Sequence, residues 1–171
     1  LGKEQAAFLA KQTVIALKES GYQPEQVTHH VPEITLYFAS SDGVVHAIDA
    51  ETGRILWRTS VGKPGYPTLR PAVNEQAVAV IYGSTLYMLR RTSGEVYWET
   101  RLTGVPVAGP AISHRMVFTL AMNGFLEAFH LDELDKEPWR FQSTGRGMGR
   151  PRVLASTVSW STGQGHVYVG D

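Results

Sequence analysis

The 171-residue sequence contains no cysteine, which excludes disulfide bonds, thiolate metal ligands, cysteine nucleophiles and a lipidated N-terminal cysteine from this chain. No apolar run approaches ~18 residues, so no transmembrane helix is expected. Neither charge is in excess, since 16 Lys and Arg balance 16 Asp and Glu. This balance argues against a protein that coats nucleic acid or an anionic membrane. An initiating Met and a basic, then apolar leader are both missing, so we expect a chain that is processed, trimmed or an excerpt.

A repeat of 41 residues runs through most of the chain. Trp57, Trp98 and Trp139 are each separated by 41 residues, and Gly53 and Gly94 stand four residues before the first two. Each tryptophan is followed by a proline that opens an apolar segment. These prolines are Pro71, Pro110 and Pro151. Equal spacing with similar flanking residues indicates an internal repeat.

Each repeat contains short apolar stretches separated by turns. Asp42-Gly43 and Asn123-Gly124 are hairpin signals, because these residue types tolerate a positive φ. The expected strands are 36–39, 44–48, 54–59, 78–81, 86–89, 95–101, 116–120, 125–129 and 138–142, and each Pro-led segment supplies a further strand. Four strands in roughly 41 residues are typical of a β-propeller blade, so we expect an all-β fold, a partial β-propeller of four-stranded blades.

The N-terminal segment differs from the repeats. Residues 3–19 carry Ala7, Ala10, Val14 and Leu17 as an apolar stripe at helical spacing, and Gly21 would end such a helix. Alternatively, β-branched residues at 13–15 favour a strand over residues 12–18. Residues 24–32 are polar and predict a linker. We therefore expect a short helix and linker over residues 1–33 and propeller blades over residues 34–171.

The last repeat stops before its tryptophan. Residues 158–161, 162–165 and 166–169 predict strand, turn and strand, whereas the next tryptophan of the series would fall near position 180. About three and a half blades are present, and propellers close with about four to eight. A sheet edge left within a blade exposes unpaired backbone groups. We expect the remaining blades from the same, longer chain, with self-association of several copies as the alternative.

The residues before and at Trp57 resemble the tryptophan-docking motif of the quinoprotein-type (PQQ-like) β-propeller repeat. The match consists of Ala47, Asp49, Thr52, Gly53 and Trp57 at the spacing of that family. The resemblance covers residues 34–171 and implies the propeller fold.

Two weaker copies of the motif follow. The second keeps Gly94 and Trp98 but has Arg90 at the Asp position, and the third keeps Trp139 and the spacing but has Asp135 at the Gly position. An indole buries a large flat surface, and a glycine lets it lie against bare backbone. The resemblance implies that each Trp stacks on the motif of the next blade, while the Asp and Thr side chains tie the turn together.

The resemblance leaves two functions open. One branch comprises dehydrogenases that bind pyrroloquinoline quinone and Ca²⁺, use an Asp base and carry a disulfide between adjacent cysteines. That disulfide is absent from this stretch, and no catalytic, cofactor-binding or metal-binding residue of that branch can be placed on this sequence. The other branch comprises non-enzymatic propellers of bacterial envelopes, such as BamB-like lipoproteins of outer-membrane assembly.

We expect the second branch, which implies a scaffold without catalysis or cofactor that binds protein partners in the periplasm or cell envelope. The extracytoplasmic location rests on the resemblance alone. A segment of a PQQ- and Ca²⁺-dependent dehydrogenase is the alternative.

The segment Gly145-Arg146-Gly147-Met148-Gly149-Arg150 is unusual in composition. Its glycines can form an anion-binding nest of backbone N–H groups, to which Arg146, Arg150 and Arg152 add charge. The segment follows the Trp139 strand, so we expect residues 143–152 to form an interaction loop on one face of the propeller. The alternative is an inter-blade loop that only needs positive φ angles.

Several other residues are weaker candidates. Tyr66 lies in a second inter-blade loop, residues 62–70. Trp160 is expected to be a core or blade-face residue, and it would anchor an interface if it were exposed. His29 and His30 are adjacent, and neighbours on a strand point to opposite faces, which favours a solvated pair over a metal site. The other histidines lack ligand spacing. They are His46, His114, His130 and His166.

Overall fold

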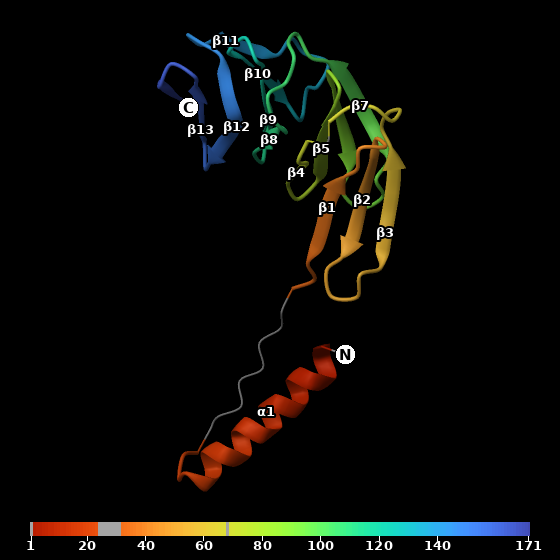
Figure 1. Ribbon diagram of the computed structural model, residues 1–171, viewed down its shortest axis with the longest axis vertical. Helices are drawn as coiled ribbons and strands as arrows, with labels where there is room; N and C mark the ends of the chain where they lie inside the picture. Colours follow the sequence, from red (N-terminus) through yellow and green to blue (C-terminus); the bar gives the residue numbers. More distant parts are fainter. Residues whose placement is uncertain (1, 24–31, 68) are drawn as a thin grey trace.

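The computed structural model describes residues 2–23, 32–67 and 69–171. One helix precedes four antiparallel sheets that stand side by side like the blades of a propeller (Figure 1). The prediction of an all-β partial propeller with a short N-terminal helix is thus confirmed. The pair His29 and His30 lies outside the described residues, so its assignment as a solvated pair and not a metal site stays a prediction.

The four sheets contain three, four, four and three strands in chain order. The first consists of β1 (Thr35–Ala39), β2 (Val44–Asp49) and β3 (Ile55–Ser60). The second consists of β4 (Ala72–Val73), β5 (Ala77–Tyr82), β6 (Thr85–Arg90) and β7 (Val96–Arg101). The third consists of β8 (Ala111–Ile112), β9 (Met116–Leu120), β10 (Phe125–His130) and β11 (Trp139–Gln142). The fourth consists of β12 (Gly147–Leu154), β13 (Thr157–Thr162) and β14 (Val167–Gly170).

Each predicted strand therefore falls within a residue or two of an observed one, and the Pro-led segments supply β4, β8 and β12. Four-stranded blades are found for the two middle sheets, whereas the outer two contain three described strands.

The repeat extends to a local irregularity of the backbone. The pairing of β2 with β3 shifts register between Ala47 and Ile48, and the pairing of β6 with β7 shifts between Met88 and Leu89, one repeat later. In both sheets the repeat tryptophan pairs with the residue just before the shift, Trp57 with Ala47 and Trp98 with Met88. A bulge bends and twists its strand, which re-aims the side chains beside it.

The hydrophobic core is divided among the interfaces between neighbouring sheets. One cluster joins the first two sheets and includes Val45, Trp57 and Val80. A second joins the middle sheets, and a third joins the last two around Leu126 and Trp160. All six side chains of β5 are buried, because this strand lies between two of these clusters. Such layers remove both faces of β5 and most of β9 and β10 from water and are the main source of stability.

Helix α1 spans Gly2–Glu19, so the alternative of a strand over residues 12–18 is wrong. It ends as predicted at Gly21, whose φ of 86° is open to glycine at little cost, while the N–H of Tyr22 donates to the Leu17 carbonyl. The apolar residues of the helix remain in water, with Phe8 and Leu9 each 60% exposed. Within the described ranges, no helix has the length and apolarity needed to cross a membrane.

The segment of residues 143–152 is not one loop, which corrects the prediction. Strand β12 begins at Gly147, so only residues 143–146 connect the third sheet to the fourth, and Arg150 and Arg152 lie within a strand. The positive φ angles of Gly145 (89°) and Gly149 (67°) accommodate the turn and the irregular pairing of β12 with β13. The Pro-led strand therefore starts four residues before its proline, which the 41-residue pattern did not indicate.

Candidate functional site

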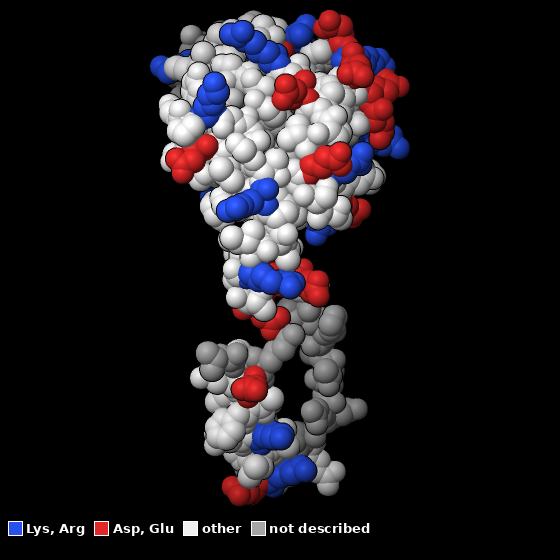
Figure 2. All heavy atoms as spheres, turned by 90° about the vertical axis from the view of Figure 1, so that its right-hand side faces the viewer, with Lys and Arg blue, Asp and Glu red and all other residues white. Residues whose placement is uncertain are grey.

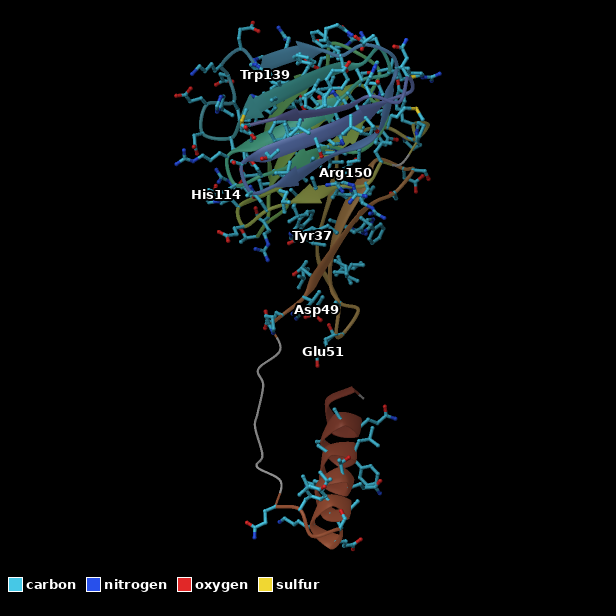
Figure 3. The ribbon with its side chains drawn as sticks, turned by 90° about the vertical axis from the view of Figure 1, so that its left-hand side faces the viewer. Tyr37, Asp49, Glu51, His114, Trp139 and Arg150 are labelled. Carbon is cyan, nitrogen blue, oxygen red and sulfur yellow. The ribbon has the colours of Figure 1, made fainter. Side chains whose placement is uncertain are left out.

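The motif turn of the first sheet is held by Asp49. Its Oδ1 accepts hydrogen bonds from the N–H groups of Glu51 (3.0 Å) and Thr52 (2.8 Å), and the Thr52 hydroxyl accepts one from the N–H of Arg54 (3.3 Å). Hydrogen bonds to the Asp49 carboxyl, first that of the Thr52 N–H and then those of the Thr52 side chain and the Glu51 N–H, lower its pKa from its ordinary value. Gly53 closes the turn with a φ of 70°. In Figure 3 the labelled Asp49 and Glu51 lie at the tip of the first sheet, away from the other three.

Trp57 docks on the corresponding turn of the second sheet. Its Nε1 donates to the Arg91 carbonyl at 2.9 Å, and the Thr59 hydroxyl donates to the Gly94 carbonyl at 2.6 Å. A methyl group on Gly94 would lie 2.6 Å from Cδ2 of the indole, so only glycine fits beneath the ring. The indole is 9% exposed. The stacking of one blade's tryptophan on the next blade's motif is therefore present at this joint.

Trp98 makes a looser version of the same joint. Its Nε1 donates to Oδ1 of Asp135 at 3.3 Å, and its ring meets Phe129 edge-on at 5.6 Å between centroids. Phe129 and Asp135 stand where the first motif has Ala47 and Gly53, so a side-chain contact replaces the glycine contact.

Trp139 behaves differently from the other two. It is 47% exposed and stacks on Phe141 of its own strand at 6.1 Å, rather than on the motif of another sheet. Figure 3 shows it at the end of the molecule far from Asp49.

Glu127 ties the second and third sheets together, a role that the sequence analysis missed. Its carboxylate is 2% exposed and accepts bonds from the N–H (3.1 Å) and hydroxyl (2.7 Å) of Thr103, which follows β7. Nε of Arg140 on β11 adds a charged bond at 3.3 Å. A single Glu in the otherwise apolar run of β10 was the available signal, since a buried carboxylate requires partners.

The candidate interaction residues divide into exposed and buried ones. Arg146 and Arg152 are exposed, Arg150 is half-buried, and Tyr66 is 56% exposed while its ring meets Tyr82 edge-on at 5.6 Å. Trp160 is 5% exposed, stacks on Tyr168 and donates from Nε1 to the Ser143 hydroxyl at 3.3 Å. Trp160 is thus a core residue and not an interface anchor, which removes it from the candidates.

Two hollows lie on the described surface. One, of about 640 Å³, lies between the first two sheets, where β1 and the start of β4 meet. Its lining comprises Thr35, Leu36, Tyr37, Arg70, Pro71, Val73, Asn74, Glu75 and Arg91. The other, of about 290 Å³, lies beside Trp98 and Glu127, both of which serve the joint between the second and third sheets. The lining of the first combines apolar side chains with two arginines and one acidic residue, Glu75, so it offers a ligand both apolar contact and charge.

The electrostatics of the described surface are mixed. In Figure 2, acidic and basic side chains are interspersed and neither sign covers the drawn face. Across the described positions, no three His, Asp or Glu side chains are grouped so that they could hold a metal ion. The mixed acidic and basic side chains of the described surface can bind a ligand through hydrogen bonds and charge.

Comparison with known proteins places this repeat in a family. The family model described as outer membrane protein assembly factor BamB matches residues 25–171. The chain belongs to this family. The match begins within the predicted linker and spans the four sheets, in agreement with the quinoprotein-type repeat found at Trp57.

Individual relatives are distant. BamB of Yersinia pestis is 28% identical over 106 residues, which cover 56% of this chain and 27% of that protein. BamB of Burkholderia pseudomallei is 24% identical over 108 residues, which cover 63% of this chain and 28% of that protein. The crystal structure of BamB from Moraxella catarrhalis superposes with a TM-score of 0.67 at 20% identity, covering 85% of this chain and 48% of that one. The chain thus spans a little over a quarter of the length of these curated relatives, and the structural likeness concerns the fold.

Proposed function

We propose that this chain is a non-catalytic propeller scaffold that binds protein partners in a bacterial envelope, as part of the assembly of outer-membrane proteins. The single observation that carries the proposal is membership of a family described as an outer membrane protein assembly factor over residues 25–171. The extracytoplasmic location follows from the same membership and is part of the proposal.

The motif residues support a scaffold because they are used to join sheets. Asp49 closes a turn, Gly94 supports an indole, and the side-chain N–H of Trp57 donates a hydrogen bond to the neighbouring sheet. Sheets joined in this way form a rigid body on which the connecting loops are held in fixed positions. Rigidity matters for binding, since a pre-organised surface loses less conformational entropy when a partner docks.

Two exposed candidate residues, Tyr66 and Arg146, supply a surface on which a protein partner could dock. Tyr66 presents an aromatic ring that is anchored on one side by Tyr82, and Arg146 lies in the short connection between the third and fourth sheets. Tyr and Arg are the residue types most often found at the centre of protein interfaces.

The test is site-specific photo-crosslinking in the natural bacterium. A photoreactive residue replaces Tyr66 in one variant and Arg146 in another, and Thr92, an exposed turn residue, is the control position. We expect a discrete adduct with a protein of the outer-membrane assembly machinery from the first two positions and none from Thr92. Adducts of equal yield at all three positions would argue against a defined binding surface.

Cell fractionation tests the location independently. Release of the protein by osmotic shock or with the envelope is expected, and recovery with the cytoplasm would overturn the envelope part of the proposal. Stoichiometric binding of pyrroloquinoline quinone in the presence of Ca²⁺, read from the visible spectrum of the purified protein, would replace the scaffold with the dehydrogenase alternative.

A further inference from the structure

Three neighbouring sheets bring together arginines that are far apart in the sequence. Arg70 directly precedes Pro71 at the start of β4, Arg150 directly precedes Pro151 in β12, and Gly109 holds the same repeat position before β8. Strand β8 contacts both β4 and β12, so Arg70 and Arg150 flank Gly109. The three strands are edge strands of their sheets, and they converge on the inner side of the propeller (Figure 1).

Gly109 keeps the space between the two arginines free of a side chain. A methyl group at this position would overlap the carbonyl oxygen of Arg70, so the backbones pass too closely for any other residue. Arg152 joins the group from β12, two residues beyond Arg150, and its charge lies close enough to that of Arg150 to repel it, while Pro151 between them is fully buried. Figure 3 shows Arg150 on the side of the C-terminal sheets that lies toward Tyr37 of the first sheet.

Three other cations of the described chain are paired with acidic groups. Arg90 pairs with Glu95, Lys136 with Glu133, and Arg140 with both Glu127 and Glu137. Within residues 2–23, 32–67 and 69–171, by contrast, no ion pair or side-chain hydrogen bond engages the guanidinium of Arg70, Arg150 or Arg152. Glu75 lines the hollow that Arg70 also lines, and no ion pair joins the two.

The proximity of these charges disfavours the charged form of Arg150. Burial lowers the pKa of the Arg150 guanidinium, and repulsion by Arg70 and then by Arg152 lowers it further. Like charges brought together without a counter-ion destabilise the fold, and an anion bound among them would relieve that cost.

We propose that Arg70, Arg150 and Arg152, here called the arginine cluster, bind the carboxylates of an acidic segment of a protein partner. The guanidinium fork matches a carboxylate in two parallel hydrogen bonds, which a single ammonium cannot do. The hollow beside Arg70 adds exposed Leu36 and Val73, so apolar side chains between the acidic ones have a surface on which to pack. This mixture of cations and apolar groups favours an acidic peptide over a simple phosphate. The inference rests on the proposed protein-binding function and names the chemistry of one partner.

The experiment measures binding of a fluorescein-labelled peptide of alternating Glu and Ala to the full chain by fluorescence anisotropy. A peptide with Gln in place of Glu is the ligand control. We expect saturable binding of the Glu peptide only, weakened by added NaCl because the contacts are ionic. The affinity of the double variant R70Q/R150Q for the Glu peptide should fall by roughly tenfold or more, since it loses charge-assisted bonds.

Arg58, an exposed arginine on β3, supplies the matched control variant R58Q. It should change the affinity by less than about twofold. Equal losses in R58Q and in R70Q/R150Q would overturn the proposal, because the attraction would then be general. Displacement of the Glu peptide by inorganic phosphate at the peptide's own binding concentration would also overturn it, in favour of a phosphate site.

The thermal midpoint of the variant and the results of crosslinking and fractionation complete the test. Removal of like charges should leave the thermal midpoint of R70Q/R150Q at or above that of the natural chain. If that variant fails to fold, R152Q replaces it, since Arg152 is exposed, and an affinity of R152Q equal to that of R58Q would overturn the proposal. Failure of peptide binding with intact crosslinking at Tyr66 would reject the arginine cluster alone. Specific peptide binding by a protein recovered from the cytoplasm would instead reject the proposed envelope function.

Discussion

At the residue scale, the repeated glycines perform two different tasks that the sequence does not distinguish. Gly53 and Gly94 occupy the same repeat position with φ angles of 70° and 72°. Around Gly53 a methyl group would meet nothing within 4 Å, whereas at Gly94 it would overlap the indole of Trp57. One glycine serves the turn alone, and the other serves the turn and the joint.

This difference predicts unequal costs for the same substitution. Gly53→Ala should destabilise the chain by about 1–2 kcal/mol, the cost of a left-handed backbone for an L-residue. Gly94→Ala should lose a further ~1–3 kcal/mol, because the nearly buried Trp57 cannot move aside without opening the joint. Urea unfolding measures both. Equal costs would show that the indole relaxes freely.

Asp49 makes the stability of its turn depend on pH. Hydrogen bonds from the turn lower its pKa from the ordinary value of 3.8, so the folded state favours the carboxylate. The stabilisation is therefore complete above the unfolded pKa and is lost as the pH falls through the lower, folded pKa. Asp49→Asn keeps the Oδ1 acceptor without the charge. The stability difference between the natural chain and D49N should be largest near neutral pH and vanish in acid. A difference that stays constant from neutral pH to acid would contradict this.

At the element scale, neighbouring sheets are joined by polar contacts as well as by apolar layers. Glu127 on β10 receives three hydrogen bonds, two from Thr103 after β7 and one from Arg140 on β11. Because it is buried, these partners must all be in place for the carboxylate to be tolerated.

Glu127→Gln should destabilise the chain by about 1–3 kcal/mol, since the amide leaves the N–H of Thr103 or its own NH₂ without a partner. Glu137→Gln is the matched control, because Glu137 also pairs with Arg140 but is 86% exposed at its side chain. That change should cost about 1 kcal/mol or less. The midpoints of urea unfolding at constant m-value measure both. A larger loss for the control would mean that the surface pair, and not the buried one, holds the joint.

At the scale of the whole molecule, the helix and the sheets are separate in their packing. The described side chains of α1 lie mostly in water, while the apolar clusters of the sheets are built from residue 37 onward. The division into residues 1–33 and 34–171 remains a prediction that truncation can test.

A chain that starts at residue 24 should unfold at the same temperature as the full chain, within about 2 °C. The change in tryptophan fluorescence measures this directly, since all four tryptophans lie in the sheets. A fall of several degrees would show that α1 packs on the propeller in solution.

The strands were predictable because their signals are local and repeated. Turn dipeptides such as Asp42-Gly43, β-rich runs between them and a 41-residue interval together specify where strands begin and end, even though the third repeat had lost most of its motif. The start of β12 escaped prediction because irregular pairing with β13 extends the strand into a glycine-rich segment.

The sequence by itself determined the repeat, the order of strands and turns, and the family to which the repeat belongs, since these depend on residues close together in the chain. The tertiary structure alone decided that Trp160 is buried while Trp139 is half exposed, that Glu127 has partners, and that the charges of Arg70 and Arg150 lie close enough to interact. Burial and charge proximity depend on how separate sheets pack. A contact between residues 80 positions apart leaves no mark in the local pattern of either one.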